Sequence, residues 1–208
     1  MKNKLFYYVT GILLCFTTLC STAMAAADEV ASPFPDVPAT ADYFEAVKTL
    51  HSMGIFSGDE KGNFNPDKTI TRAEAAKVIC LLLGVGNEAA TMTKQVFSDV
   101  PSMHWAVGYV AKAAELEIIG GYGNGKFGPS DSVTYEQMVK MLVCAWGYGS
   151  AATGEGGWPS GYLYIAKSIG ITESNVVNTA GPIARSIVAQ LAYNTIRLSP
   201  YNEYDMEG

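Results

Sequence analysis

The residue best suited to ligand chemistry is Arg72, within the Thr-Arg-Ala-Glu segment at 71–74. It falls at the first position of an expected helix, where the positive end of the helix dipole disfavours a cation. Backbone N–H groups without partners at the same place attract anions. A docked carboxylate would therefore suit this arginine, because a guanidinium grips a carboxylate through paired hydrogen bonds. The alternatives are a solvated arginine and one paired to Asp36 or Asp99.

Two later positions correspond to Arg72 and differ in charge. Tyr135 stands at the second position, where it cannot supply a positive group, and Arg185 stands at the third. At the third position Ala184 and Ile187 also replace the neighbouring threonine and glutamate. The pattern therefore predicts a good anion site at Arg72, a second candidate at Arg185 and an altered site at Tyr135.

Aromatic and glycine residues near these positions could contact a ligand. Trp105 or Trp158 could cover an apolar face of that ligand, although tryptophan at equivalent places in helical repeats also serves core packing. Gly123, between Gly121 and Gly125, could let a ligand approach the backbone closely. More often such glycines only supply the positive φ that a turn requires, and both interpretations stay open.

The threonine and glutamate of the 71–74 segment have a structural explanation. Thr71 suits the N-cap of a helix and Glu74 suits the third helical position, which together form a capping box. Thr134 and Gln137 repeat the same pair further along the chain. Each cap stabilises its helix by about 1 kcal/mol.

These residues belong to an internal repeat. Residues 34–84 align with 97–147 at a constant offset of 63 and without a gap. A weaker third copy contains Trp158 and Arg185, and its central loop is three residues shorter. Self-similarity of this kind indicates a repeat architecture.

Each copy predicts a helix, a loop and a second helix. Apolar residues recur at helical spacing in the second helices of the first two copies, at Ala75, Val78, Ile79, Leu82, Met138, Met141, Leu142 and Ala145. One helix pair cannot enclose a core, whereas three pairs can pool their apolar faces. The sequence therefore predicts an all-α fold in which three helix-loop-helix repeats form a pseudo-threefold helical bundle.

The motifs of the repeat resemble the S-layer homology (SLH) family. The first copy has Phe-Pro-Asp-Val at 34–37, glycines at 58 and 62, Phe-Asn-Pro at 64–66 and Ile-Thr-Arg-Ala-Glu at 70–74. The second copy has Phe-Ser-Asp-Val at 97–100, His-Trp-Ala at 104–106, glycines at 121, 123 and 125, and Val-Thr at 133–134. The resemblance covers roughly residues 33–198.

This resemblance implies a three-motif module that binds secondary cell wall polysaccharide non-covalently, often through pyruvylated sugars, and so holds proteins on a Gram-positive-type envelope. In the family the arginine of the Thr-Arg-Ala-Glu signature contacts the ligand in a groove between motifs. That role carries over to Arg72 and, less directly, to Arg185, and it does not carry over to Tyr135. The first copy has Asp42 where the others have tryptophan. The alternative function is a protein–protein or self-assembly module of a surface layer, without a glycan ligand.

The domain organisation follows from the same patterns. Two lysines, an apolar run and small residues predict a secretory signal peptide at 1–25, with an uncleaved membrane anchor as the alternative. The remaining expected segments are a linker (26–32), an SLH domain (33–198) with motifs at 33–86, 96–149 and 154–198, and an acidic tail (199–208). We therefore expect a secreted protein of the cell wall or surface layer, without a membrane segment after cleavage.

Composition excludes several classes of protein. The 208 residues carry a net charge of −6, and 49% are hydrophobic against 16% charged, which excludes an intrinsically disordered chain. Nucleic acid is an unexpected partner, since it requires a basic surface. Cys80 and Cys144 are expected as buried free thiols, with a single bridge as the alternative.

We expect no cofactor, no metal site and no catalytic activity. A calcium loop that began at Asp59 would need glycine and glutamate where Phe64 and Ile70 stand. No nucleophile–base set can be identified in the sequence. Asp36 and Asp99 could mimic the paired carboxylates of a glycoside hydrolase, but they recur once per repeat, which favours a structural turn or cap.

Overall fold

The computed structural model describes residues 32–172 and 181–198, which contain helices and loops but no strand. The helices are α2 (Phe44–Ser52), α3 (Arg72–Leu82), α4 (Gly86–Thr91), α5 (Val107–Glu115), α6 (Tyr135–Ala145), α7 (Gly149–Gly154), α8 (Ser160–Ile169) and α9 (Arg185–Ile196). The all-α prediction is confirmed. The predicted signal peptide, most of the linker and the acidic tail lie outside the described residues.

The predicted capping boxes mark the starts of α3 and α6. The Glu74 N–H donates to Thr71 Oγ1 at 3.2 Å, and Glu74 Oε2 accepts from the Thr71 N–H at 2.7 Å. Thr134 and Gln137 form the same pair of bonds at 3.3 Å each. Helix α9 begins after Ala184, whose methyl group offers no cap. The structural interpretation of the threonine pairs is confirmed.

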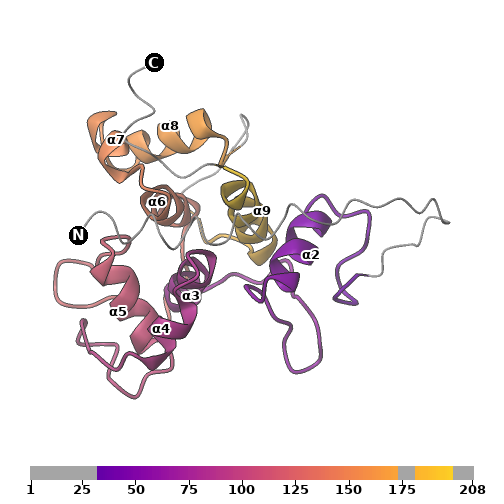
Figure 1. Cartoon of the computed structure of the whole chain (residues 1–208), viewed down its shortest axis with the longest axis horizontal. Helices are drawn as coiled ribbons and strands as arrows, with labels where there is room; N and C mark the ends of the chain where they lie inside the picture. Colours follow the sequence, from indigo (N-terminus) through magenta and orange to yellow (C-terminus); the bar gives the residue numbers. More distant parts are fainter. Residues whose placement is uncertain (1–31, 173–180, 199–208) are drawn as a thin grey trace.

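Helices of neighbouring copies pack in a cyclic order. The second helix of each copy lies against the first helix of the next, as α3 does with α5 and α6 with α8. The third pair closes the circle, because α9 packs against α2, which is far away in the sequence. In Figure 1 the three second helices α3, α6 and α9 lie around the centre and the other helices surround them. This pooling of apolar faces is the arrangement that the repeat required.

Backbone hydrogen bonds between copies run in the same order. The Val133 N–H donates to Ile70 O, and the Ile183 N–H donates to Val133 O, both at 3.0 Å. The Arg185 N–H then donates to Lys68 O at 2.9 Å, back in the first copy. All three copies are thus joined through the segments that lead into their second helices. A pseudo-threefold relation between whole copies stays a prediction.

Two short helices, α4 and α7, were not predicted. Each has six residues and follows a second helix. The following first helix crosses each of them at a glycine, because a Cβ on Gly108 would overlap Ala89 O and a Cβ on Gly161 would overlap Ala152 O. These glycines permit a close backbone approach, and they recur at matching places in the second and third copies.

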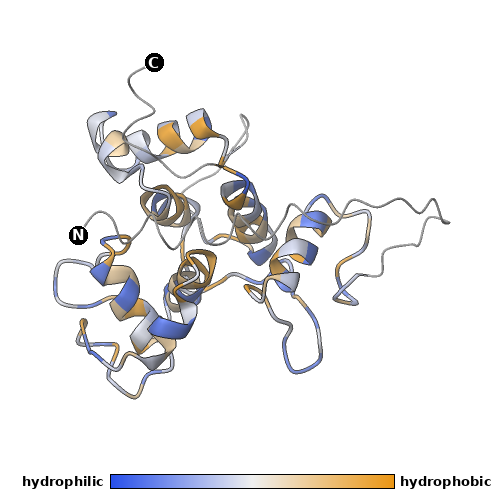
Figure 2. Ribbon diagram, in the orientation of Figure 1, coloured by the Kyte–Doolittle hydropathy of each residue, from blue (hydrophilic) through white to orange (hydrophobic). Residues whose placement is uncertain are grey.

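The core consists of the apolar faces of these helices. The residues of the predicted α3 and α6 stripes are all buried, and Figure 2 shows hydrophobic residues recurring along α3, α6 and α8. None of the helices in the described part of the chain has both the length and the apolar character needed to cross a bilayer.

Asp36 and Asp99 each fasten the loop of their own repeat. Asp36 accepts the backbone N–H groups of Phe64 and Asn65 at 2.7 and 2.6 Å. Asp99 accepts those of Phe127 and Gly128 at 2.8 Å each. Burial opposes ionisation of Asp99, but these hydrogen bonds outweigh it and lower its pKa. The predicted structural role of both aspartates is confirmed.

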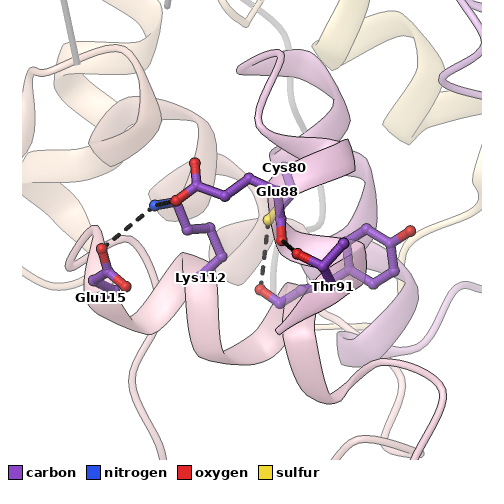
Figure 3. A network of polar contacts seen from close by, with 6 residues as sticks. Cys80, Glu88, Thr91, Lys112 and Glu115 are labelled. Atoms are coloured by element: carbon purple, nitrogen blue, oxygen red, sulfur yellow. Dashed lines mark hydrogen bonds and ion pairs between the residues drawn. The ribbon is translucent and has the colours of Figure 1, made fainter. Parts of the chain in front are cut away.

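A buried lysine ties α5 to α4. Lys112 is only 5% exposed, and its ammonium lies 2.7 Å from a Glu88 oxygen and 3.4 Å from a Glu115 oxygen (Figure 3). Burial disfavours the charged amine, but the hydrogen bonds that it donates to Glu88 and Glu115 outweigh this effect and raise the pKa of Lys112. The ion pair is therefore part of the packing between the two helices.

Cys80 and Cys144, the two cysteines in the described part of the chain, are free thiols. Cys80 is buried, and its thiol lies 3.4 Å from Tyr109 O (Figure 3). Burial raises its pKa to about 12, which makes it an unreactive thiol at neutral pH. Cys144 is half-buried, and burial also raises its pKa.

Candidate ligand-binding groove

Residues of all three copies line a groove of about 330 Å³. Arg185 comes from the start of α9, Glu74 and Lys77 from α3, and Trp105 from the turn before α5. The loop after α2 closes the groove with further side chains, among them Asp59 and Lys68. The groove therefore exists only because the third copy packs back on the first.

Arg185 is held against the wall of this groove. Its Nη2 donates to Ser57 O at 2.9 Å, and its guanidinium carbon lies 4.7 and 4.9 Å from the ring centroids of Phe56 and Phe64. Its Nε is buried without a hydrogen-bond partner among the described residues. Burial lowers the pKa of Arg185, and the charges of Glu74 and Asp36 oppose that shift. Arg185 thus brings a positive charge to the wall of the groove, while its Nε stays buried behind it.

The charged side chains of the groove comprise three cations and two anions: Arg185, Lys68, Lys77, Glu74 and Asp59. Both carboxylates already accept internal hydrogen bonds. Glu74 caps α3. Asp59 accepts from the Asn65 side chain at 2.9 Å and from two backbone N–H groups of its own loop, and these bonds lower its pKa. The groove consequently has more free positive than negative hydrogen-bonding groups.

Trp105 and Trp158 are surface residues, so the core-packing interpretation was wrong for both. Trp105 is 56% exposed, Trp158 is 48% exposed, and Trp105 lies 5.7 Å from the His104 ring in a stacked arrangement. Each tryptophan stands in the turn just before a first helix and not on the helix's apolar face. Trp105 therefore offers a flat, accessible ring at the edge of the groove.

Arg72 is buried and fully engaged with the second copy. It is 5% exposed, its Nε donates to Phe127 O at 2.9 Å, and its Nη2 donates to Gly120 O at 3.0 Å. The guanidinium carbon lies 4.9 Å from the Tyr122 ring centroid and 4.6 Å from that of Phe127. Arg72 is therefore neither solvated nor hydrogen-bonded to Asp36 or Asp99, and both alternatives were wrong. Its hydrogen bonds go to backbone carbonyls of the loop in the second copy.

The expectation of unpaired N–H groups at the helix starts was also wrong. At α3 the N–H groups of Arg72 and Ala73 donate to Asp131 O and Pro129 O, at 2.8 and 3.2 Å. At α9 the N–H groups of Arg185 and Ser186 donate to Lys68 O and Pro66 O, both at 2.9 Å. The loop of the neighbouring copy satisfies these donors. An anion bound at the start of α3 or α9 would therefore have to be held by side chains and not by backbone N–H groups.

Two further candidate residues occupy different surroundings. Tyr135 is buried with its hydroxyl beside Thr172, without a hydrogen bond of regular geometry, and burial raises its pKa to about 12. It is therefore uncharged at neutral pH. Gly123 has a φ of +83° with open space around its Cβ position, as a turn glycine has. A ligand contact of either residue stays a prediction.

Within the described residues no three His, Cys, Asp or Glu side chains gather closely enough to hold a metal ion.

Sequence reasoning did not identify Lys68, Lys77 and Ser57 as parts of a site. Each belongs to the first copy, whereas Arg185 belongs to the third. A signal was present in the alignment, because Lys77 and Lys140 occupy equivalent helical positions in the first two copies. What could not be found was the closing contact between α9 and α2, which places these residues together.

Comparisons with known proteins agree with the repeat pattern. A protein-family model described as the S-layer homology domain matches residues 33–76 and 96–139. The chain is 34% identical over 91% of its length to a cell surface protein of Thermoanaerobacter kivui, and 30% identical over 91% to a middle cell wall protein of Brevibacillus brevis. It is 33% identical over 89% to a surface layer protein of Brevibacillus choshinensis. The chain spans only 24%, 18% and 17% of these relatives.

Proposed function

Since the chain belongs to the S-layer homology family, we propose that it attaches to the cell wall by binding an acidic wall polysaccharide non-covalently. Attachment at the cell surface is the general role that the family and the relatives support. The polysaccharide, and a pyruvylated sugar as its recognised unit, are our proposal. The observation that carries it is the groove in which Arg185 and Trp105 face one space.

The groove suits the chemistry of a pyruvate ketal. Such a ketal presents a carboxylate rigidly on a sugar ring, and Arg185 can meet it with charge-assisted hydrogen bonds. Lys68 and Lys77 border the same space and add positive charge. The exposed ring of Trp105 can cover the apolar face of the sugar, as aromatic side chains in binding sites do.

Binding must rest on these short-range contacts. The chain carries a net charge of −6, so long-range electrostatics oppose the approach of an acidic polymer. This repulsion is screened beyond about 10 Å in 0.1 M salt. We infer a binding role and not a catalytic one, because the charged groups of the groove are cations and internally bonded carboxylates.

A pull-down on purified wall sacculi tests the proposal. We expect Arg185→Ala to weaken retention about 10-fold or more, the value of a hydrogen bond to a charged group. Arg197→Ala is the matched control, since it removes the same charge just after α9 and away from the groove. Chemical removal of pyruvate from the sacculi should abolish binding of the unmodified protein. Undiminished binding to stripped sacculi would refute the proposal.

A protein-binding or self-assembly role is the second candidate function. Met103 is 95% exposed beside Trp105, and Tyr164 on α8 is 56% exposed. Exposed large apolar residues can mark contacts with other proteins. Oligomers that form with rising concentration in sedimentation experiments, together with unchanged retention on stripped sacculi, would favour this role over wall binding.

A further inference from the structure

Arg72 and Arg185 lie in matching surroundings, which we call corners. The Arg185 corner consists of Arg185 with Ser57, Asp59, Phe64, Asn65 and Lys68. The Arg72 corner consists of Arg72 with Gly120, Tyr122, Phe127, Gly128 and Asp131. The loop residues of the two corners follow the offset of 63 that relates the first two copies.

Both corners hold the arginine through similar contacts, except that Arg72 Nε donates to Phe127 O at 2.9 Å while Arg185 Nε has no partner among the described residues. Nη2 of Arg72 donates to Gly120 O at 3.0 Å, and Nη2 of Arg185 donates to Ser57 O at 2.9 Å. The phenylalanine ring centroid lies 4.6 Å from the guanidinium carbon at Phe127 and 4.9 Å at Phe64. These shared contacts therefore do not explain why Arg72 is buried while Arg185 borders a groove.

The difference lies in the residue that faces the guanidinium. At the Arg72 corner the Tyr122 ring lies 4.9 Å from the guanidinium carbon, and its hydroxyl donates to Asp131 Oδ2 at 2.9 Å. Burial and this hydrogen bond raise the pKa of Tyr122, so the hydroxyl remains a donor. At the Arg185 corner Asp59 replaces Tyr122 and bonds within its own loop. The second ring near the Arg185 guanidinium is that of Phe56, at 4.7 Å, which is buried in the core, whereas the Tyr122 ring lies at the surface.

A glycine makes room for this arrangement. Gly128 has a φ of +72°, and a Cβ there would come within 2.6 Å of Tyr122 Cε2 and would overlap Asp131 Oδ2. Asn65 takes the equivalent place with a φ of +58°, and its side chain donates to Asp59 Oδ2 at 2.9 Å. Among the differences between the two loops are three that bear on the arginine, where tyrosine, glycine and aspartate replace aspartate, asparagine and lysine.

The geometry points to Tyr122 and Asp131 as an internal occupant of the Arg72 corner, so that of the two arginine corners only the one at Arg185 binds an acidic sugar. Tyr135 brings no positive charge to the start of α6, so we expect one acidic sugar per chain. This inference rests on the proposed function. The Tyr122 ring stands where the sugar would lie, and the Asp131 carboxylate supplies the nearby negative charge that a ligand would bring. Lys68 at the equivalent of Asp131 attracts an acidic ligand, whereas Asp131 repels one.

Calorimetric titration with the methyl glycoside of a hexose that carries a pyruvate ketal tests this inference. We expect one site per chain in the unmodified protein and at least 10-fold weaker binding in Arg185→Ala. The triple variant Tyr122→Asp, Gly128→Asn, Asp131→Lys gives the loop of the second copy the residues that the first copy has at these three positions. It should bind two sugars per chain.

Two simpler variants keep the test informative if the triple variant loses stability. Tyr122→Ala with Asp131→Ala removes the ring and the carboxylate and should add a second site, whereas Tyr122→Phe keeps the ring over the guanidinium and should retain one site. Circular dichroism and thermal unfolding confirm that each variant is folded before titration. A folded double variant, Tyr122→Ala with Asp131→Ala, that still binds one sugar would overturn the inference.

The stoichiometry separates this inference from the proposed function. Two sites in the unmodified protein, or full binding by Arg185→Ala, would refute the single-site inference and leave wall binding intact. An unmodified protein that binds neither the glycoside nor sacculi would refute the proposed function, and the inference with it.

Discussion

Arg72 and Arg185 begin equivalent helices, yet Arg72 is 5% exposed and Arg185 borders a groove of about 330 Å³. Arg72 lies in the complete Thr-Arg-Ala-Glu signature, whereas Arg185 is flanked by Ala184 and Ile187. The signature therefore marks a well-capped helix and does not by itself mark an open site. The loop that the neighbouring copy lays over the guanidinium decides whether the arginine stabilises the fold or remains accessible.

The largest expected effect separates the two arginines by stability. Arg72→Ala leaves the carbonyls of Phe127 and Gly120 without their charged partner inside the protein, and should lower the free energy of unfolding by about 3 kcal/mol. Arg185→Ala removes one bond, to Ser57 O, and should cost about 1 kcal/mol. Urea unfolding of both variants measures the difference.

Arg197→Ala serves as the control for loss of a surface arginine and should change the free energy of unfolding by less than about 0.5 kcal/mol. Equal losses for Arg72→Ala and Arg185→Ala would show that the two corners do not differ in the way the contacts indicate.

A smaller effect concerns the aspartate that fastens the loop of the Arg72 corner. Asp99→Asn should cost about 1–2 kcal/mol at neutral pH, because the amide can accept only one of the two N–H groups that the carboxylate accepts. The folded pKa of Asp99 is lowered. Its contribution is thus complete above the unfolded pKa and is lost as pH falls through the folded pKa.

Urea titrations from about pH 7 to about pH 3 measure this pH dependence. The gap between the unmodified protein and Asp99→Asn should narrow as the solution becomes more acidic. Asp36→Asn is the matching change in the Arg185 corner and should cost a similar amount at neutral pH. A gap that is constant over the whole pH range would contradict the prediction for Asp99.

The smallest expected effect is a gain at the uncapped helix α9. Ala184 has φ −72° and ψ 149°, close to the −82° and 162° of Thr71, so a threonine fits its backbone. Ala184→Thr with Ile187→Glu should add a capping box and stabilise the protein by about 0.5–1 kcal/mol. Thermal unfolding measures the gain, and Thr71→Ala should show the converse loss. An unchanged melting temperature of the double variant would refute the assignment.

The local features of the fold could be predicted from the sequence. The apolar stripes of α3 and α6, their capping pairs and the structural role of Asp36 and Asp99 depend on residues close together or on recurrence at a fixed offset. The exposure of Trp105 and Trp158 could not be predicted, because apolar composition favours burial while their position in turns before α5 and α8 leaves them at the surface.

The candidate site could be predicted only in part. Arg185 and Trp105 were identified by alignment with other copies, but Arg72 had the stronger motif and lies buried. The groove combines Lys68, Lys77 and Arg185, which no spacing in the sequence brings together. Tyr122 carried no signal of its own, because its effect depends on Gly128 leaving space for the ring.

The sequence by itself determined an all-α repeat protein with capped second helices and a loop fastened by one aspartate in each of the first two copies. Only the tertiary structure decided which arginine is accessible. The reason is physical: helix formation and capping depend on neighbours within a few residues, whereas the exposure of a guanidinium depends on the loop of another copy packed against it. The first and third copies meet across more than one hundred residues, between Ser57 and Arg185.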